Sequence, residues 1–287
     1  MPVLTPDQLK RYRAETFCMT AQGRIYSAQQ AVEFVNQRGF VFFWPIKDIT
    51  FPSLWVAAAG DRPVADAHDD PGHKTWGWKD SLLPKKVWFY TRLLRKRNTI
   101  ISLQSIPYFY ALSPNFGSPE EDYLIEYEEG RMPLETRQVY EALLKEGPLD
   151  TLALRRAAHL QSSSSNTAFN RALESLQVSL RILPVGVSEA GAWHYAFIYD
   201  LVHRHFPNLI DEAGPISEYE ARRCLLMQYF QSVGAATAAM ATKLFGWRAE
   251  DVTRALEKLK QAGRLVDAVE IPGEKHAHWA LPELIRG

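Results

Sequence analysis

The sequence predicts an α+β protein, mainly helical, made of three tandem winged-helix (helix-turn-helix) domains. Residues 131–208 and 209–287 each read as three helices followed by a β-hairpin, which is the element order of a winged helix. Residues 170–182 (NRALESLQVSLRI) also resemble residues 253–266 (TRALEKLKQAGRLV), at the matching place of the two regions. A supersecondary unit that recurs indicates an internal repeat. We therefore predict domains at 1–130, 131–208 and 209–287, the first being a degenerate winged helix with added helices.

The third domain has the clearest signals. Ser217 and Glu220 stand at capping-box spacing ahead of a helical apolar stripe. A second, short helix is expected to end at Gly246, and a third at Gly263. Residues 264–284 then alternate as two strands around a Pro-Gly turn. The periodicity of the apolar residues and the residues that start and end helices indicate the same elements throughout this domain.

The first domain is less regular. It begins with two expected helices, the second capped by Ser27 and ended at Gly39. Further along the chain we expect a short helix at 51–60, a loop rich in Asp, Pro and Gly at 61–80, and a basic amphipathic helix at 81–97.

An aromatic run stands between these helices, in the stretch RGFVFFWPIKD. It is apolar on both faces, so it is either a fully buried core segment or a strand whose rings contact something flat. We expect Phe40 and either Phe42 or Phe43 to fill the core. Trp44, held at a turn by Pro45, is the candidate for a stacking surface.

Composition limits the classes of protein that need to be considered. The 287 residues are 46% hydrophobic with a formal net charge of zero, so affinity for nucleic acid must come from local patches. Cys18 and Cys224 form neither a disulfide framework nor a metal-ligand set. The N-terminus turns polar at once and no apolar run approaches 18 residues. We expect a soluble cytoplasmic protein without a signal peptide or membrane span.

Winged helices favour double-stranded DNA as the partner, because a third helix fits the major groove and a wing can contact the backbone. The segment 85–97 adds six cations without an acid between them. The alternative is that these charges are only solvated, or that the domains pack on a protein partner. The candidate DNA-binding residues are Trp44, Trp76, Trp78, Lys85, Lys86, Arg92, Arg95, Lys96, Arg97, Asn166, Asn170, Arg171, Arg248, Arg254 and Lys258.

Signals for chemistry are weak. Lys79 and Asp80 have the groups for amine attack on a sugar carbon with a carboxylate helper, but a Trp-rich structural corner with a surface ion pair is the favoured explanation of the same residues. His68, Asp69, Asp70 and His73 can be drawn as a metal site, but they lie in a segment of turn residues. No phosphate-binding loop or GxGxxG is present, so we expect no metal, nucleotide or other cofactor.

Three segments resemble a known family, the AlkZ/YcaQ-type DNA glycosylases that unhook interstrand crosslinks, and more closely the shorter AlkZ-related proteins. QRGFVFFWPI (37–46) lies where those glycosylases have Gly-Φ-Val-Gln-Φ-Asp/Gln, with Φ an apolar residue. WGWKDSLLPKKVW (76–88) is similar to their Trp-Gly-His-Glu-Ala-Ser-Leu-Leu-Pro segment, and residues 228–259 are similar to their third winged helix. The resemblance implies tandem winged helices that cradle duplex DNA.

The same comparison implies that the family's catalytic groups are missing. Its Gln and Asp/Gln, which position water and stabilise the sugar cation, fall on Phe42 and Trp44. Neither side chain can accept a proton or offer a carbonyl oxygen. The family's His-Glu pair falls on Trp78 and Lys79, which reverses the local charge. The chain ends at Gly287, so we do not expect the family's C-terminal β-rich module.

Three hypotheses on function follow. The first is a DNA-binding protein on the glycosylase scaffold that recognises damaged or distorted duplex. The second is an active glycosylase that uses Lys79 and Asp80. The third is a transcriptional regulator or a protein-interaction module.

Overall fold

The computed structural model describes residues 2–115, 117–191 and 194–285. Within them the strands form antiparallel three-stranded sheets with the orders β1-β3-β2, β4-β6-β5 and β7-β9-β8. Each sheet belongs to a unit with the same order: a helix, a short strand, two helices, and a hairpin whose last strand lies in the middle of the sheet. The predicted fold class, a mainly helical α+β protein of tandem winged helices, is confirmed, and all three units follow one plan.

We call these units the first, second and third repeats. The first repeat consists of α2 (Ala28–Arg38), β1 (Phe40–Phe42), α3 (Leu54–Ala59), α4 (Lys74–Leu82), β2 (Phe89–Arg92) and β3 (Asn98–Ile101). The second consists of α7 (Leu134–Glu146), β4 (Leu149–Asp150), α8 (Thr151–Ala157), α9 (Asn166–Val178), β5 (Ile182–Ser188) and β6 (Ala196–Leu201). The third consists of α12 (Glu218–Val233), β7 (Ala235–Ala236), α13 (Ala238–Phe245), α14 (Ala249–Gln261), β8 (Val266–Val269) and β9 (His278–Ala280).

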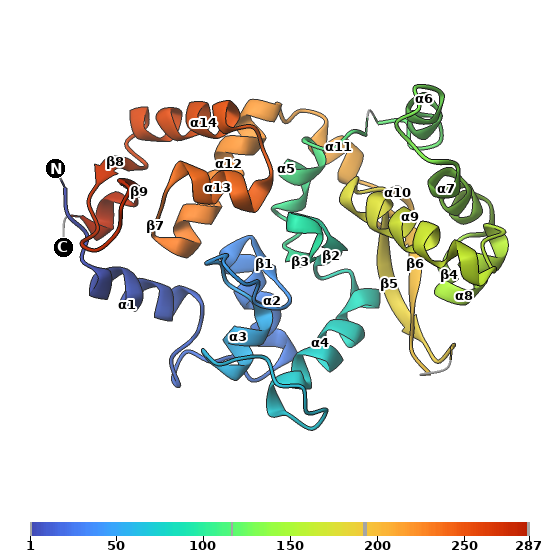
Figure 1. The fold of residues 1–287 in the computed structure, drawn as a ribbon, viewed down its shortest axis with the longest axis horizontal. Helices are drawn as coiled ribbons and strands as arrows, with labels where there is room; N and C mark the ends of the chain where they lie inside the picture. Colours follow the sequence, from blue (N-terminus) through green and yellow to red (C-terminus); the bar gives the residue numbers. More distant parts are fainter. Residues whose placement is uncertain (1, 116, 192–193, 286–287) are drawn as a thin grey trace.

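Short helices connect or flank the repeats. The α-helices among them are α1 (Pro6–Thr16), α5 (Ile106–Tyr110), α6 (Asp122–Glu128), α10 (Val202–His205) and α11 (Leu209–Ala213). The 3-10 turns are η1 (Pro71–His73), η2 (Leu83–Lys85), η3 (Leu94–Lys96), η4 (Ser163–Ser165) and η5 (Pro282–Leu284). In Figure 1 the second repeat, green to yellow, and the third, orange to red, lie on opposite sides of the blue-to-cyan first repeat.

Several expected helix ends are confirmed. The Ser27 hydroxyl accepts a hydrogen bond from the Gln30 backbone N–H at the start of α2, and Ser217 accepts one from Glu220 at the start of α12. At Gly39, which ends α2, φ is +79°, a conformation that favours glycine. Local capping chemistry was therefore enough to place these helices.

The expected basic helix over 81–97 is wrong. A single 3-10 turn containing Pro84 follows α4, and Lys86 then takes a left-handed φ of +53° that ends it. The aromatic and β-branched residues that come next form β2, which pairs with β3 as the wing hairpin of the first repeat. Phe89 and Tyr90 are both buried, each in a different hydrophobic cluster. Burial on both faces of a strand thus overrides the helical interpretation.

The expected loop over 61–80 is also only partly correct. Its last seven residues belong to α4, which begins at Lys74 and stands as the third helix of the first repeat. Turn chemistry does hold the part before it: Asp70 accepts a hydrogen bond from the Gly72 backbone N–H and pairs with Arg62 at 2.6 Å. The short helices α10 and α11 connect the second and third repeats.

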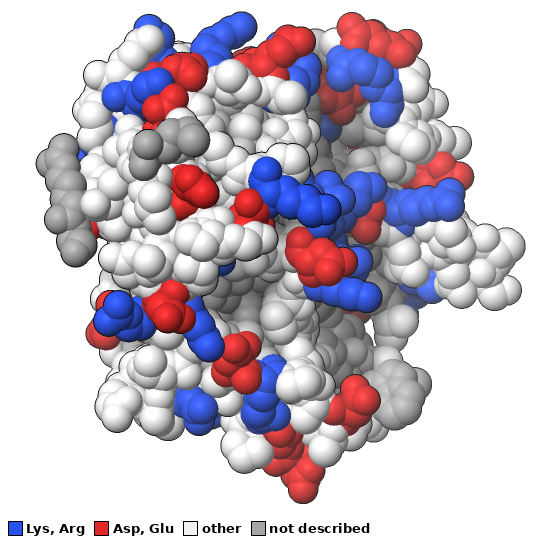
Figure 2. Space-filling view, turned by 60° about the vertical axis from the view of Figure 1, so that its left-hand side comes forward, with Lys and Arg blue, Asp and Glu red and all other residues white. Residues whose placement is uncertain are grey.

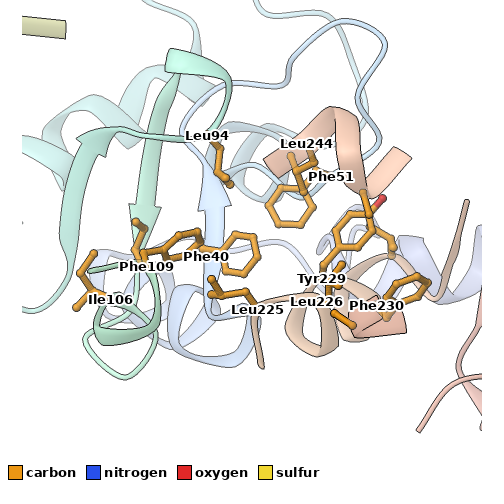
Figure 3. Close-up of a cluster of buried hydrophobic side chains, with 14 of the residues drawn as sticks. Phe40, Phe51, Leu94, Ile106, Phe109, Leu225, Leu226, Tyr229, Phe230 and Leu244 are labelled. Carbon is orange, nitrogen blue, oxygen red and sulfur yellow. The ribbon is translucent and has the colours of Figure 1, made fainter. Parts of the chain in front are cut away.

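The first and third repeats share one hydrophobic core. Rings of the first repeat pack in it against α12 and α13, and Phe51 stacks on Tyr229 with 5.8 Å between ring centroids (Figure 3). The second repeat has a separate core, around Val139, Tyr140 and Leu176. The predicted boundaries at residues 130 and 208 stay predictions.

Helix α1 packs on the third repeat. The Arg13 guanidinium donates hydrogen bonds to the carbonyls of Val233 and Ala235, at 3.0 and 2.9 Å, and Tyr12 donates to that of Gln231. A cation at carbonyls left free by a helix C-terminus is favourable, so α1 caps α12. Among the described residues no helix is long and apolar enough to cross a membrane.

Candidate nucleic-acid interface

The wing of the first repeat presents a group of cations. The chain reverses between β2 and β3 at Arg95 and Lys96, which have left-handed φ values of 53° and 56°. Arg92, Arg95, Lys96 and Arg97 are exposed around this turn. In a winged helix the wing is an element that can contact the DNA backbone.

Arg92, Lys96 and Arg97 border a cleft of about 540 Å³, which we call the basic cleft, whereas Arg95 does not line it. Its walls come from the segment after β1, the wing of the first repeat and helix α9 of the second repeat. Lys96 pairs with Glu174 across it at 3.0 Å, whereas no described carboxylate lies within ion-pair distance of Arg92 or Arg97. The lining residues are Trp44, Pro45, Ile46, Lys47, Arg92, Lys96, Arg97, Asn98 and Glu174.

The third repeat supports one wall of the basic cleft. Lys243 of α13 donates a hydrogen bond to the backbone carbonyl of Asp48 at 2.9 Å, next to Lys47. All three repeats therefore contribute to the geometry of this site. In the view of Figure 2 the surface is hollowed near its middle, and Lys and Arg side chains gather beside the hollow.

The other predicted contacts divide into three groups. Asn166, Asn170 and Arg171 are exposed on α9, and the last two lie one turn before Glu174 of the basic cleft. Lys85 and Lys86 are exposed at the opposite end of β2 from Arg92, so the predicted run of six cations is split in two. Arg248, Arg254 and Lys258 are exposed at α14 but do not line the basic cleft, and Arg248 pairs with Asp251 at 3.1 Å.

Two of the three predicted tryptophans, Trp44 and Trp76, lie near one another. Trp44 is half-buried, and its ring centroid is 6.0 Å from that of Trp76. Trp76 is 43% exposed. Trp78 is half-buried, with the Lys74 ammonium 5.2 Å from its ring centroid. Trp44 alone of the three lines the basic cleft.

Phe42 and Trp44, which the resemblance aligns with the family's catalytic pair, diverge in space. Phe40, Phe42 and Phe43 are all buried, and Phe42 packs edge-on against Phe51 at 5.7 Å. Trp44, two residues after Phe42, opens onto the cleft. Most of the aromatic run is therefore buried core, which was one of the two expected alternatives. Its last ring, that of Trp44, lies at the surface. Phe42 is out of reach of any ligand in the cleft.

Lys79 is buried rather than part of a surface ion pair. Its ammonium donates a hydrogen bond to the Tyr195 hydroxyl and contacts Asp80 Oδ1, both at 2.8 Å, and Tyr195 donates to the same oxygen at 3.0 Å. Its side chain is 3% exposed. The ring centroids within 6 Å of the ammonium belong to Phe197 (4.5 Å), Trp76 (5.3 Å), Tyr195 (5.5 Å), Tyr90 (5.6 Å) and Phe43 (5.8 Å).

This arrangement suits a structural cation more than a nucleophile. Burial lowers the pKa of Lys79, and the hydrogen bond to Asp80 opposes that shift. Burial, reinforced by Asp80, also raises the pKa of Tyr195. Because aromatic rings and two oxygen atoms surround the amine, a deoxyribose carbon has no open approach to it. The contacts instead join α4 of the first repeat to the β5–β6 hairpin of the second.

Sequence reasoning missed three residues of this region. Lys47 stands three residues after Trp44, and its charge close to the aromatic run was the available signal. Glu174 and Tyr195 come from the second repeat, and nothing in their local sequence places them against the first.

The loop that could be drawn as a metal site has other contacts. His73 Nε2 lies 3.0 Å from the backbone oxygen of Ala65. The Asp70 carboxylate accepts hydrogen bonds from the Arg62 guanidinium and the Gly72 backbone N–H. Across the described part of the chain no group of three or more His, Cys, Asp or Glu side chains is placed to hold a metal ion.

Comparisons with known proteins agree on one family. A family model described as AlkZ related matches residues 25–246. Among solved structures, the DNA glycosylase AlkZ of Streptomyces sahachiroi superimposes with a TM-score of 0.62 at 12% identity, over 98% of this chain and 71% of that chain. At that identity the likeness shows the fold. A comparison with curated proteins found no match.

Proposed function

Because this chain belongs to the AlkZ-related family, we propose that it is a DNA-binding protein on a DNA-glycosylase-like scaffold. In this proposal the basic cleft contacts the phosphates of double-stranded DNA. The observation that carries it is the placement of Arg92 and Arg97, unpaired by any described carboxylate, on one wall of a cleft with Lys47 and Lys96.

Charge geometry supports this function more than composition does. The chain has no net charge, so it has no general attraction to polyanions. Four cations and one acid around the basic cleft nevertheless make a local positive site, which can displace counterions from phosphates. The exposed Asn170 and Arg171 on α9 extend this surface on a helix that corresponds to the recognition helix of a winged helix.

We further propose that binding, and not base excision at the family's positions, is the activity of this chain. Phe42 has no oxygen or nitrogen to position water and is fully buried. Lys79, the alternative nucleophile, is enclosed by rings and already bonded to Tyr195. Damaged or distorted duplex is the proposed target class, and the cytoplasm the proposed compartment.

The test compares how DNA affinity depends on salt in variants with the same loss of charge. Arg92→Ala/Arg97→Ala removes two cations of the basic cleft, whereas Lys145→Ala/Arg156→Ala removes two cations that line a cavity between α7 and α8. Each phosphate contact contributes about −0.9 to the slope of log K against log salt concentration. The first variant should therefore make this negative slope shallower by about 1.8. The second should leave it unchanged. Equal slopes in all three proteins would refute the assignment.

A further inference from the structure

Trp76 and Tyr195 form an exposed aromatic pair beside the basic cleft. Trp76 is 43% and Tyr195 37% exposed, a large apolar area for side chains held at an interface between two repeats. Their ring centroids are 6.4 Å apart and the planes are tilted by 55°, so neither ring covers the face of the other. Trp76 also lies 6.0 Å from Trp44, which lines the cleft. Trp76 therefore contacts both Tyr195 and the tryptophan that lines the basic cleft.

Both exposed rings are fixed by the same buried group. The Tyr195 hydroxyl is held by the Lys79 ammonium at 2.8 Å and by Asp80 Oδ1 at 3.0 Å. The Trp76 ring lies over the same ammonium, with 5.3 Å to its centroid. Rings that are already ordered lose little conformational entropy when a ligand stacks on them. Lys79 and Asp80 thus act as positioning residues for this pair.

We propose that Trp76 and Tyr195 are a stacking site for an unpaired nucleobase, and that this protein prefers duplex DNA containing such a base to intact duplex. The proposal rests on the proposed function and names its substrate class. A groove of cations that tracks phosphates, with aromatic side chains beside it, is how proteins bind unpaired nucleotides. The cations of the adjoining cleft select a polyanionic ligand over an apolar segment of a protein partner.

Two DNA ligands test the idea, an intact duplex and the same duplex with a single bulged 2-aminopurine, whose fluorescence falls on stacking. The wild-type protein should bind the bulged duplex more tightly and quench its fluorescence. Trp76→Ala should lose the quenching and weaken bulge binding by about 5- to 150-fold in Kd, with intact-duplex affinity little changed. Tyr195→Ala should act in the same direction, and Trp76→Phe should keep part of the preference. Tyr219→Ala, which removes an aromatic ring 39% exposed on α12, is the matched control.

The outcomes separate this inference from the proposed function. Equal wild-type affinity for both duplexes, without quenching, would overturn the stacking site and leave duplex binding intact. Unchanged quenching in Trp76→Ala and Tyr195→Ala, with folding verified by circular dichroism, would also overturn it. Arg92→Ala/Arg97→Ala should bind both duplexes more weakly than wild type. At low salt, where its binding can still be measured, it should keep the preference for the bulged duplex. Absence of wild-type binding to either duplex would reject both proposals.

Discussion

Lys79 gives the sharpest prediction about stability. Lys79→Met keeps an unbranched side chain of similar length but removes the charge and both polar contacts, to Tyr195 and Asp80. Removing one partner of a buried ion pair costs about 3–5 kcal/mol, because the other charge stays buried without compensation. Asp80 is 20% exposed and retains the hydrogen bond from Tyr195, so we expect a smaller loss in the free energy of unfolding, about 2–3 kcal/mol.

The double variant Lys79→Met/Asp80→Asn separates charge from packing. It removes the uncompensated carboxylate, so it should recover about 1–2 kcal/mol relative to the sum of the two single variants. Urea unfolding followed by tryptophan fluorescence and by circular dichroism gives the midpoints, and agreement between the two probes checks that the transition is cooperative. A Lys79→Met protein within about 0.5 kcal/mol of wild type, or strictly additive single effects, would refute the reasoning.

Two further predictions concern the core and alkaline pH. Phe42→Gln, which introduces an amide where the resemblance places one of the family's catalytic residues, should lower the free energy of unfolding by about 3–5 kcal/mol because Phe42 is fully buried. Trp44→Gln at the cleft should cost less, and equal urea midpoints for the two variants would contradict this. Burial raises the pKa of Tyr199 from 10.0 to about 12, so between these values the folded chain binds more protons than the unfolded chain, and stability should fall as pH rises from 10 to 12. Tyr199→Phe should reduce this pH dependence, and urea midpoints that fall equally in Tyr199→Phe and wild type between pH 10 and pH 12 would contradict the linkage.

The sequence predicted the parts of the fold that local signals determine. Ser27 and Gly39 bound α2 as expected because a hydroxyl cap and a positive φ are local requirements. The wing of the first repeat was wrongly predicted as a helix. It is stabilised by the pairing of β2 with β3 and by the burial of Phe89 and Tyr90 on opposite faces. Both depend on tertiary contacts that the local sequence does not show. Helical periodicity in a short apolar run cannot be distinguished from a buried strand.

The candidate site was predictable only in part. Trp44 and the cations Arg92, Lys96 and Arg97 were candidates from composition, and the antiparallel pairing of β1, β3 and β2 brings them to one cleft. Tyr195 could not be found, because its contact with Lys79 depends on how the second repeat docks on the first, across 116 residues of sequence.

The central claim, that the basic cleft binds duplex DNA, is tested most directly by fluorescence anisotropy of the wild-type protein with an intact labelled duplex over a series of salt concentrations. If three to four cleft cations contact phosphates, log K should fall linearly with log salt, with a slope of about −2.7 to −3.6. Absence of binding at the lowest salt, or affinity that does not depend on salt, would contradict the claim.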